Sequence, residues 1–330
     1  MNLKTQPWVI ELDESRPGDD ENSSSSVSIE PALRSVIHLQ PYYDFSDINI
    51  ITDCDVLAEL LSCDLTAVHT YIAELIGGTI ILLPEQATVN EGSHGKYARA
   101  FASGHFTHAP SCEDTQKHYR LTSYRFGEVR LLVRHEADGM HGRSYLTHSP
   151  PEASEALDLG NARLTFGGEK ISPDAVMEFH VQSPTGSQGD TDDATSVEIH
   201  ASHLPKLWLA QISKFTVATP VKVAPPSAVC DSPADWRADA VVFPRGNIHT
   251  WPSVRQDTAK WEKEHQSEIA ALHEKLAELR EGVKAAAADQ EGTMFRCTLI
   301  QQLGWSTDAV ADGSQRLAAD LVERVKKGYA

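Results

Sequence analysis

Two short segments of the sequence place acidic side chains at alternate positions. Glu136 and Asp138 lie in VRHEADG, and Glu178 and His180 lie in VMEFHVQ. Because alternate residues of a strand point to the same face of its sheet, each pair shares one face if its segment is a strand. If the two strands are neighbours, three carboxylates and one imidazole come together. These four residues are the candidate catalytic residues.

A carboxylate cluster of this kind predicts a divalent metal site. Carboxylates crowded together are costly to desolvate unless a cation or hydrogen-bond donors neutralise them. Oxygen ligands suit Mg²⁺ or Mn²⁺, so Glu136, Asp138 and Glu178 are the candidate metal ligands. Such an ion would catalyse phosphodiester hydrolysis by activating water. The alternative is a solvated strand face, since short E-x-D and E-x-H patterns often arise by chance.

The segments around these residues predict an α+β fold. Apolar and β-branched runs predict strands, and the apolar spacing of CDVLAELLS predicts a helix that Asp53 could cap. We therefore expect a central mixed or antiparallel sheet with flanking helices. The predicted strands cover residues 47–51, 79–83, 119–126, 129–135, 161–166, 174–182 and 196–200.

A long amphipathic helix is predicted at about residues 257–288. Its apolar residues follow 3-4-3-4 spacing and cover about two heptads, fewer than a coiled coil requires. The helix could pack on its own domain or form a dimer seam, and both alternatives stay open. The apolar residues are Ile269, Leu272, Leu276, Leu279 and Val283.

Composition limits the classes of partner and compartment. The 330 residues carry 29 Lys and Arg against 47 Asp and Glu, a net charge of −18. Because a surplus of negative charge opposes contacts with phosphate, nucleic acid could bind only in a local basic groove. We expect no membrane span and no secretory signal, and the five scattered cysteines favour neither a disulfide framework nor a zinc ribbon. The sequence therefore predicts an intracellular protein of the cytoplasm or nucleus. Residues 1–35 are expected to be disordered or loosely attached, and 36–330 to form a single domain.

Several segments resemble a family of fungal proteins often labelled geranylgeranyl pyrophosphate synthetase. The stretch SYRFGEVRLLVRHEADG, Ser123–Gly139, is similar to its signature, and DINIITDCDVLAELLSC, LPKLWLAQISKF and WEKEHQSEIAALHEKL match weaker segments in the family's order. The resemblance spans roughly residues 47–327 and implies a link to fungal secondary metabolism. Prenyl transfer is not expected, because the sequence contains no DDxxD motif and predicts many strands.

The same pattern resembles the PD-(D/E)XK nuclease core of decapping exonucleases. In that core one strand bears E-x-D, the next bears E-x-K, and a preceding helix supplies a further Glu. By this resemblance Glu136 and Asp138 match the first pair and Glu178 matches the Glu of E-x-K. His180 stands where the family has Lys, and KYARAFAS, residues 96–103, offers no acid for the helical Glu. An imidazole performs only part of the work of a lysine that orients water and stabilises negative charge.

The resemblance therefore implies a nuclease-like protein with an eroded catalytic site, a pseudoenzyme acting as a binding or accessory protein. One alternative is an active nuclease or pyrophosphohydrolase dependent on Mg²⁺ or Mn²⁺. A second alternative is an interaction module, including self-association, built on the helix at 257–288.

Overall fold

The computed structural model describes most of the residues that the sequence predicts to be ordered. The described ranges are 8–12, 28–62, 68–85, 97–98, 101–102, 104–106, 117–140, 157–158, 163–164, 172–183, 193–222, 241–288, 294–300, 304–310 and 317–327.

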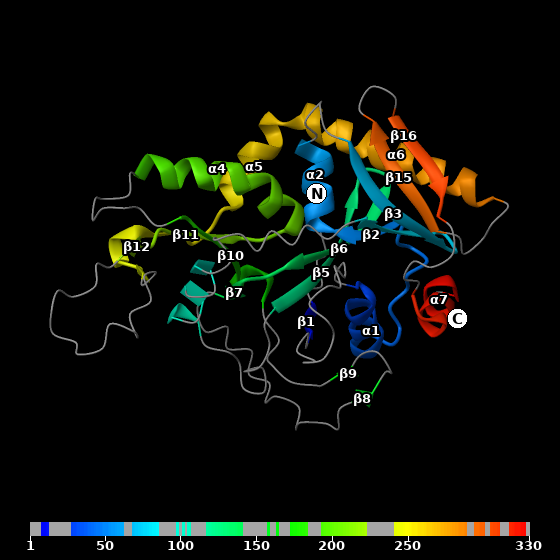
Figure 1. The fold of residues 1–330 in the computed structure, drawn as a ribbon, viewed down its shortest axis with the longest axis horizontal. Coiled ribbons are helices and arrows are strands. Elements are labelled where there is room, and N and C mark those ends of the chain that lie inside the picture. The colour runs from blue at the N-terminus through cyan, green and yellow to red at the C-terminus, as the bar shows by residue number, and fades with distance from the viewer. Residues whose placement is uncertain are drawn as a thin grey trace, which may run out of the picture.

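The larger of two main sheets has eight strands in the order β1-β5-β6-β2-β4-β3-β15-β16. Strand β2 runs parallel to both of its neighbours, β4 and β6, and the other described pairs are antiparallel. The sheet is therefore mixed, which confirms the predicted fold class (Figure 1). Its strands are β1 (Trp8–Leu12), β2 (Ile50–Asp53), β3 (His69–Ile76), β4 (Thr79–Pro84), β5 (Lys117–Phe126), β6 (Val129–Glu136), β15 (Met294–Ile300) and β16 (Gly304–Ala309).

The smaller main sheet has four strands in the order β14-β11-β10-β7. Strand β7 follows β6 after two residues and pairs antiparallel with β10, so this sheet begins where β6 ends. Its strands are β7 (Gly139–Met140), β10 (Val176–Val181), β11 (Lys214–Ala218) and β14 (Ile248–Trp251). Two further short pairs are β8 (Leu157–Asp158) with β9 (Arg163–Leu164), and β12 (Val221–Lys222) with β13 (Val241–Val242). Single 3₁₀ turns precede β10 and β14, at η1 (Pro173–Ala175) and η3 (Arg245–Asn247).

Helices cover both faces of the larger sheet (Figure 1). On one face α2 (Cys54–Ser62) and α6 (Gln266–Ala287) pack on its strands, and α4 (Asp193–Ala210) extends from there over the smaller sheet, with α5 (Arg255–Glu264) packed on α4. On the other face lie α1 (Glu30–Leu39) and α7 (Ala319–Lys327). Strand β6 shows the consequence, because Leu131 and Val133 belong to the core under α2 while Leu132 belongs to the core under α1. Strand β6 is therefore covered on both faces.

The helix predicted at 257–288 is two helices that meet at His265. The backbone of His265 leaves the helical region, with φ −115° and ψ 32°. The two helices pack on different surfaces: Trp261 of α5 lies against Trp208 of α4, with ring centroids 5.5 Å apart, whereas α6 packs on the larger sheet. The apolar row Leu272, Leu276, Leu279 and Val283 is fully buried in the chain's own core. That face is therefore not available for self-association in this fold.

The segment expected to be loosely attached, residues 1–35, overlaps a helix at its C-terminal end. Helix α1 begins at Glu30, and Ala32 and Leu33 are fully buried. Strand β1 also pairs with β5 inside the larger sheet. The predicted strand at 196–200 is wrong, because these residues lie in α4. Within the described ranges, no helix is both long enough and apolar enough to cross a membrane.

Candidate functional site

The four candidate residues lie where the two main sheets meet. Glu136 is the last residue of β6, Asp138 lies between β6 and β7, and Glu178 and His180 are on β10. The Asp138 Oδ2 atom accepts a hydrogen bond of 2.8 Å from the backbone N–H of Phe179. This bond and the pairing of β7 with β10 hold the end of β6 beside β10.

The Glu178 carboxylate forms a buried ion pair with a lysine from helix α4. Glu178 is 6% exposed, and its Oε1 lies 3.0 Å from Lys206 Nζ. The same ammonium is 3.3 Å from Asp55 Oδ1, at the start of α2. Burial lowers the pKa of Lys206, but the charges of Glu178 and Asp55 outweigh that effect and raise the pKa overall. Lys206 therefore remains a cation at neutral pH.

Asp138 is held toward its protonated form. Its pKa is raised well above the usual value, first by burial and then by the charge of Glu178, with a smaller contribution from Glu136. The hydrogen bond from Phe179 and the charge of Lys206 act in the opposite direction but are weaker. The three candidate acids are thus close enough to interact, and the ammonium of Lys206 balances part of their negative charge.

The arrangement differs from that of a ready-made metal site. A bound Mg²⁺ or Ca²⁺ requires several oxygens within about 2.0–2.6 Å of one point. In the part of the chain that the structure describes, no three His, Cys, Asp or Glu side chains come together in a way that could hold a metal ion. The ammonium of Lys206 instead lies against the most buried carboxylate. The residues in their present positions do not fit a metal ion, and the ligand role of Glu136, Asp138 and Glu178 stays a prediction.

One oxygen of the cluster is left unsatisfied. Glu178 Oε2 is buried and has no hydrogen-bond partner among the described residues. An unpaired buried carboxylate oxygen costs free energy, so it marks a place where a hydrogen-bond donor would be stabilised.

His180 packs against a second histidine. Its ring centroid is 4.9 Å from that of His203, with an angle of 64° between the ring planes. His203 lies one helical turn before Lys206 on α4, and its Nδ1 is 2.9 Å from the carbonyl oxygen of Ile199. Glu178 and His180 therefore share a face of β10, as their spacing predicts, and this face is covered by α4.

The segment in which the resemblance expects a helical acid is described only in part. Its residues 97–98 and 101–102 are helical. Tyr97 and Phe101 are buried with Val181 of β10, and the ring of Phe101 is 5.2 Å from that of Phe179. Lys96 and residues 99–100 lie outside the described residues. The described part of this segment thus supplies aromatic packing to the opposite face of β10.

Comparisons with known proteins identify the fold. A family model described as a domain of unknown function, DUF8563, matches residues 15–220. No match was found among the curated proteins. The fold is similar to S. pombe Rai1, with a TM-score of 0.52, 8% identity, and coverage of 85% of this chain and 77% of that one. It is also similar to Candida albicans Rai1 in complex with pU5-Mn²⁺, with a TM-score of 0.50, 9% identity, and coverage of 91% and 81%. Scheffersomyces stipitis Rai1 gives a TM-score of 0.50, 9% identity, and coverage of 91% and 79%.

These similarities establish the nuclease-like fold. The mixed sheet with flanking helices is similar to that of the Rai1 structures, as expected from the resemblance to a PD-(D/E)XK core. At this level of identity they bear on the fold and not on the activity.

Proposed function

This chain belongs to the DUF8563 family of unknown function, and we propose that it is a nuclease-like protein with an eroded catalytic site that acts as a binding or accessory protein. The proposal concerns catalysis; the fold on which it rests is that of the Rai1 exonucleases. The link to fungal secondary metabolism stays a prediction of the resemblance.

The ion pair between Glu178 and Lys206 is the observation that carries this proposal. Glu178 corresponds to the Glu of E-x-K, and its carboxylate is neutralised by an ammonium 3.0 Å away. A divalent ion binding here would bring two positive charges next to that ammonium in a buried place, where Coulomb repulsion is weakly screened. Lys206 therefore opposes metal binding and supplies the positive charge that the acids require.

His180 supports the same proposal. An imidazole stabilises developing negative charge less than the ammonium of a lysine does. His180 is also engaged with the ring of His203 under α4. Neither feature favours the orientation of an attacking water beside a phosphate.

The second candidate function is an active nuclease or pyrophosphohydrolase dependent on Mg²⁺ or Mn²⁺. The unpaired Oε2 of Glu178 favours it, because this oxygen would gain a partner if an ion were bound. Lys206 would then serve as the lysine that the E-x-K position lacks. Candida albicans Rai1, which has a similar fold, was solved with pU5 and Mn²⁺.

A cleavage assay separates the two functions. The purified full chain is incubated with 5′-phosphorylated pentauridylate and Mn²⁺, and the products are resolved on a gel. The proposal predicts intact oligonucleotide, with no difference between the wild type and Glu178→Gln. As a control for surface charge, Glu128→Gln changes an exposed acid in the β5–β6 turn. Cleavage by the wild type and by Glu128→Gln, but not by Glu178→Gln, would establish the second function.

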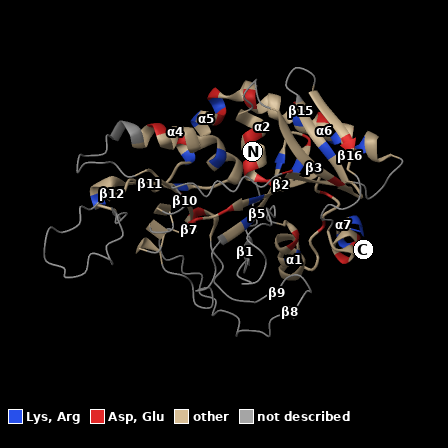
Figure 2. Ribbon diagram, viewed as in Figure 1, with Lys and Arg blue, Asp and Glu red and all other residues tan. Residues whose placement is uncertain are grey.

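Nucleic acid is not excluded as a ligand by the loss of cleavage. Figure 2 shows Lys and Arg positions scattered among Asp and Glu positions along α5 and α6, in keeping with a net charge of −18. Binding of the same oligonucleotide, measured by fluorescence anisotropy at low and high salt, tests for a local groove. Such a groove predicts an affinity that falls steeply with salt.

A further inference from the structure

A second buried group of nitrogens lies on strands β5 and β6, separate from the acidic cluster. Arg120 is 2% exposed, and its partner in the strand register is His135, which is 5% exposed. Neither Glu136, Asp138 nor Glu178 lines the space that these two side chains face.

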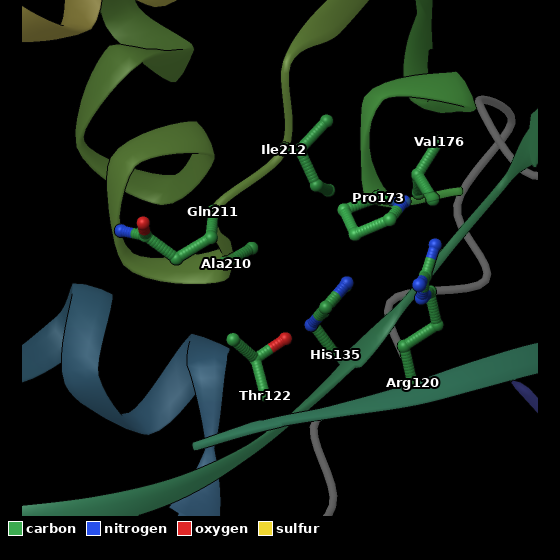
Figure 3. Close-up of a pocket in the computed structure, with 8 residues that line it drawn as sticks. All are labelled: Arg120, Thr122, His135, Pro173, Val176, Ala210, Gln211 and Ile212. Carbon is green, nitrogen blue, oxygen red and sulfur yellow. The ribbon is translucent and has the colours of Figure 1, made fainter. Parts of the chain in front are cut away.

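That space is a small cavity between the larger sheet and the end of α4. Figure 3 shows Arg120, Thr122 and His135 extending from the paired strands toward Gln211, after α4, and Pro173, before β10. Its volume is about 20 Å³. A cavity needs roughly 10–15 Å³ to hold a water molecule, so this one accommodates a single small occupant.

The nitrogens around the cavity lack hydrogen-bond partners. Both terminal nitrogens of Arg120 and Nδ1 of His135 are buried and unbonded within the described ranges. Burial lowers the pKa of Arg120 to about 10, so the guanidinium still carries a charge at neutral pH. A buried charge without a partner costs several kcal/mol by general estimates.

Two other arginines on these strands, Arg134 and Arg130, have acidic partners. Arg134 Nε is 2.6 Å from Asp53 Oδ1, and Arg130 Nη1 is 2.7 Å from Asp47 Oδ2. Arg120 has no such carboxylate among the described residues, although it is more deeply buried than Arg130. The unmet charge of Arg120 is therefore specific to this cavity.

We propose that the cavity beside Arg120 binds one small monovalent anion of the size of chloride. The guanidinium supplies one positive charge, which one monovalent anion neutralises. Its two unbonded terminal nitrogens are donors from which a spherical anion accepts hydrogen bonds without directional constraint, and Nδ1 of His135 is a third donor in the tautomer that is protonated there.

Thermal unfolding of the full chain tests this site. The chain is heated in chloride and in gluconate, which is too large to enter, at equal ionic strength. Anion binding to the folded state alone raises the folding constant by 1 + [L]/Kd, about tenfold when chloride is present at ten times its Kd. We expect a rise in Tm with chloride or bromide and none with gluconate.

The matched variants are Arg120→Met and Arg125→Met. Both change an arginine of β5, but Arg125 is exposed. Chloride stabilisation should vanish in Arg120→Met and persist in Arg125→Met. A crystal soaked in bromide gives a second readout that needs no variant, an anomalous peak beside the Arg120 guanidinium.

Three outcomes would overturn the proposal. One is equal stabilisation by chloride and gluconate, which is a general salt effect. Another is chloride stabilisation that survives in Arg120→Met. The third is a bromide-soaked crystal without a peak in the cavity. None of these outcomes concerns the acidic cluster, so the proposed function is tested independently of this anion site.

Discussion

Substitution of either Glu178 or Lys206 should lower the free energy of unfolding by an amount between the values typical of a surface ion pair and of a fully buried ion pair. Removing one partner of a buried pair costs about 3–5 kcal/mol, whereas exposed pairs contribute about 0.2–1 kcal/mol. The Glu178 side chain is 7% exposed, but that of Lys206 is 32% exposed, so water screens part of the interaction. We therefore expect Glu178→Gln and Lys206→Met each to cost about 2–3 kcal/mol.

The double variant should cost less than the sum of the single changes. When both partners are removed, no unpaired charge is left buried, so the coupling free energy should be about 1–2 kcal/mol. The assay is equilibrium unfolding in urea of the wild type, both single variants and the double variant. The exposed pair Lys260–Glu264, 3.9 Å apart with side chains 75% and 56% exposed, is a matched control and should show a coupling below about 0.5 kcal/mol. A coupling at Glu178–Lys206 no larger than in the control would refute the assignment of Lys206 as the cation of the cluster.

Three further predictions concern stability. Burial, with the charge of Arg120, lowers the pKa of His135 to about 3. The neutral imidazole therefore favours the folded state fully above pH 6.5, and the free energy of unfolding should fall, by at most about 5 kcal/mol, as the pH drops to 3. Urea unfolding from pH 7 to 4 measures this loss, and a free energy that does not change with pH would contradict the prediction. Leu276→Ala should lower the free energy of unfolding in urea by about 2–5 kcal/mol, because this side chain is fully buried in its own chain. Sedimentation should show an unchanged oligomeric state, and a changed state without loss of stability would argue that Leu276 lies in an interface with a partner. Gly127→Ala should lower Tm, because Gly127 has φ +59° and an added Cβ would clash with the His273 ring. Gly78→Ala, whose Cβ would meet nothing within 4 Å, should leave Tm nearly unchanged, and equal effects would refute the strain argument.

The sequence predicts much of the fold because the apolar patterns are local. The run VRLLVRH gives strand β6, and 3-4-3-4 spacing identifies the apolar face of α6. The break at His265 has no Gly or Pro signal, because it reflects the packing of α5 on α4 and of α6 on the sheet. Ser196–His200 has β-branched residues but belongs to α4, which shows tertiary packing overriding a weak local preference.

The candidate site was predictable only within single strands. Alternation places Glu178 and His180 on one face, and that is a local property. Lys206 gives no such signal, because its approach to Glu178 depends on how α4 packs across β10. The segment LPKLWLAQISKF attracts notice for its resemblance to a family, but only the three-dimensional arrangement shows that its lysine neutralises an acid. The charge of Arg120 is likewise unremarkable in sequence and becomes informative only through its burial.

Calorimetric titration of Mn²⁺ into the wild-type chain and into Lys206→Met tests the account of the acidic cluster most directly. With Lys206 neutralising Glu178, the wild type should show no saturable binding at millimolar Mn²⁺, and removal of the ammonium should increase affinity. Saturable binding by the wild type that Glu178→Gln removes and Lys206→Met leaves unchanged would contradict the account.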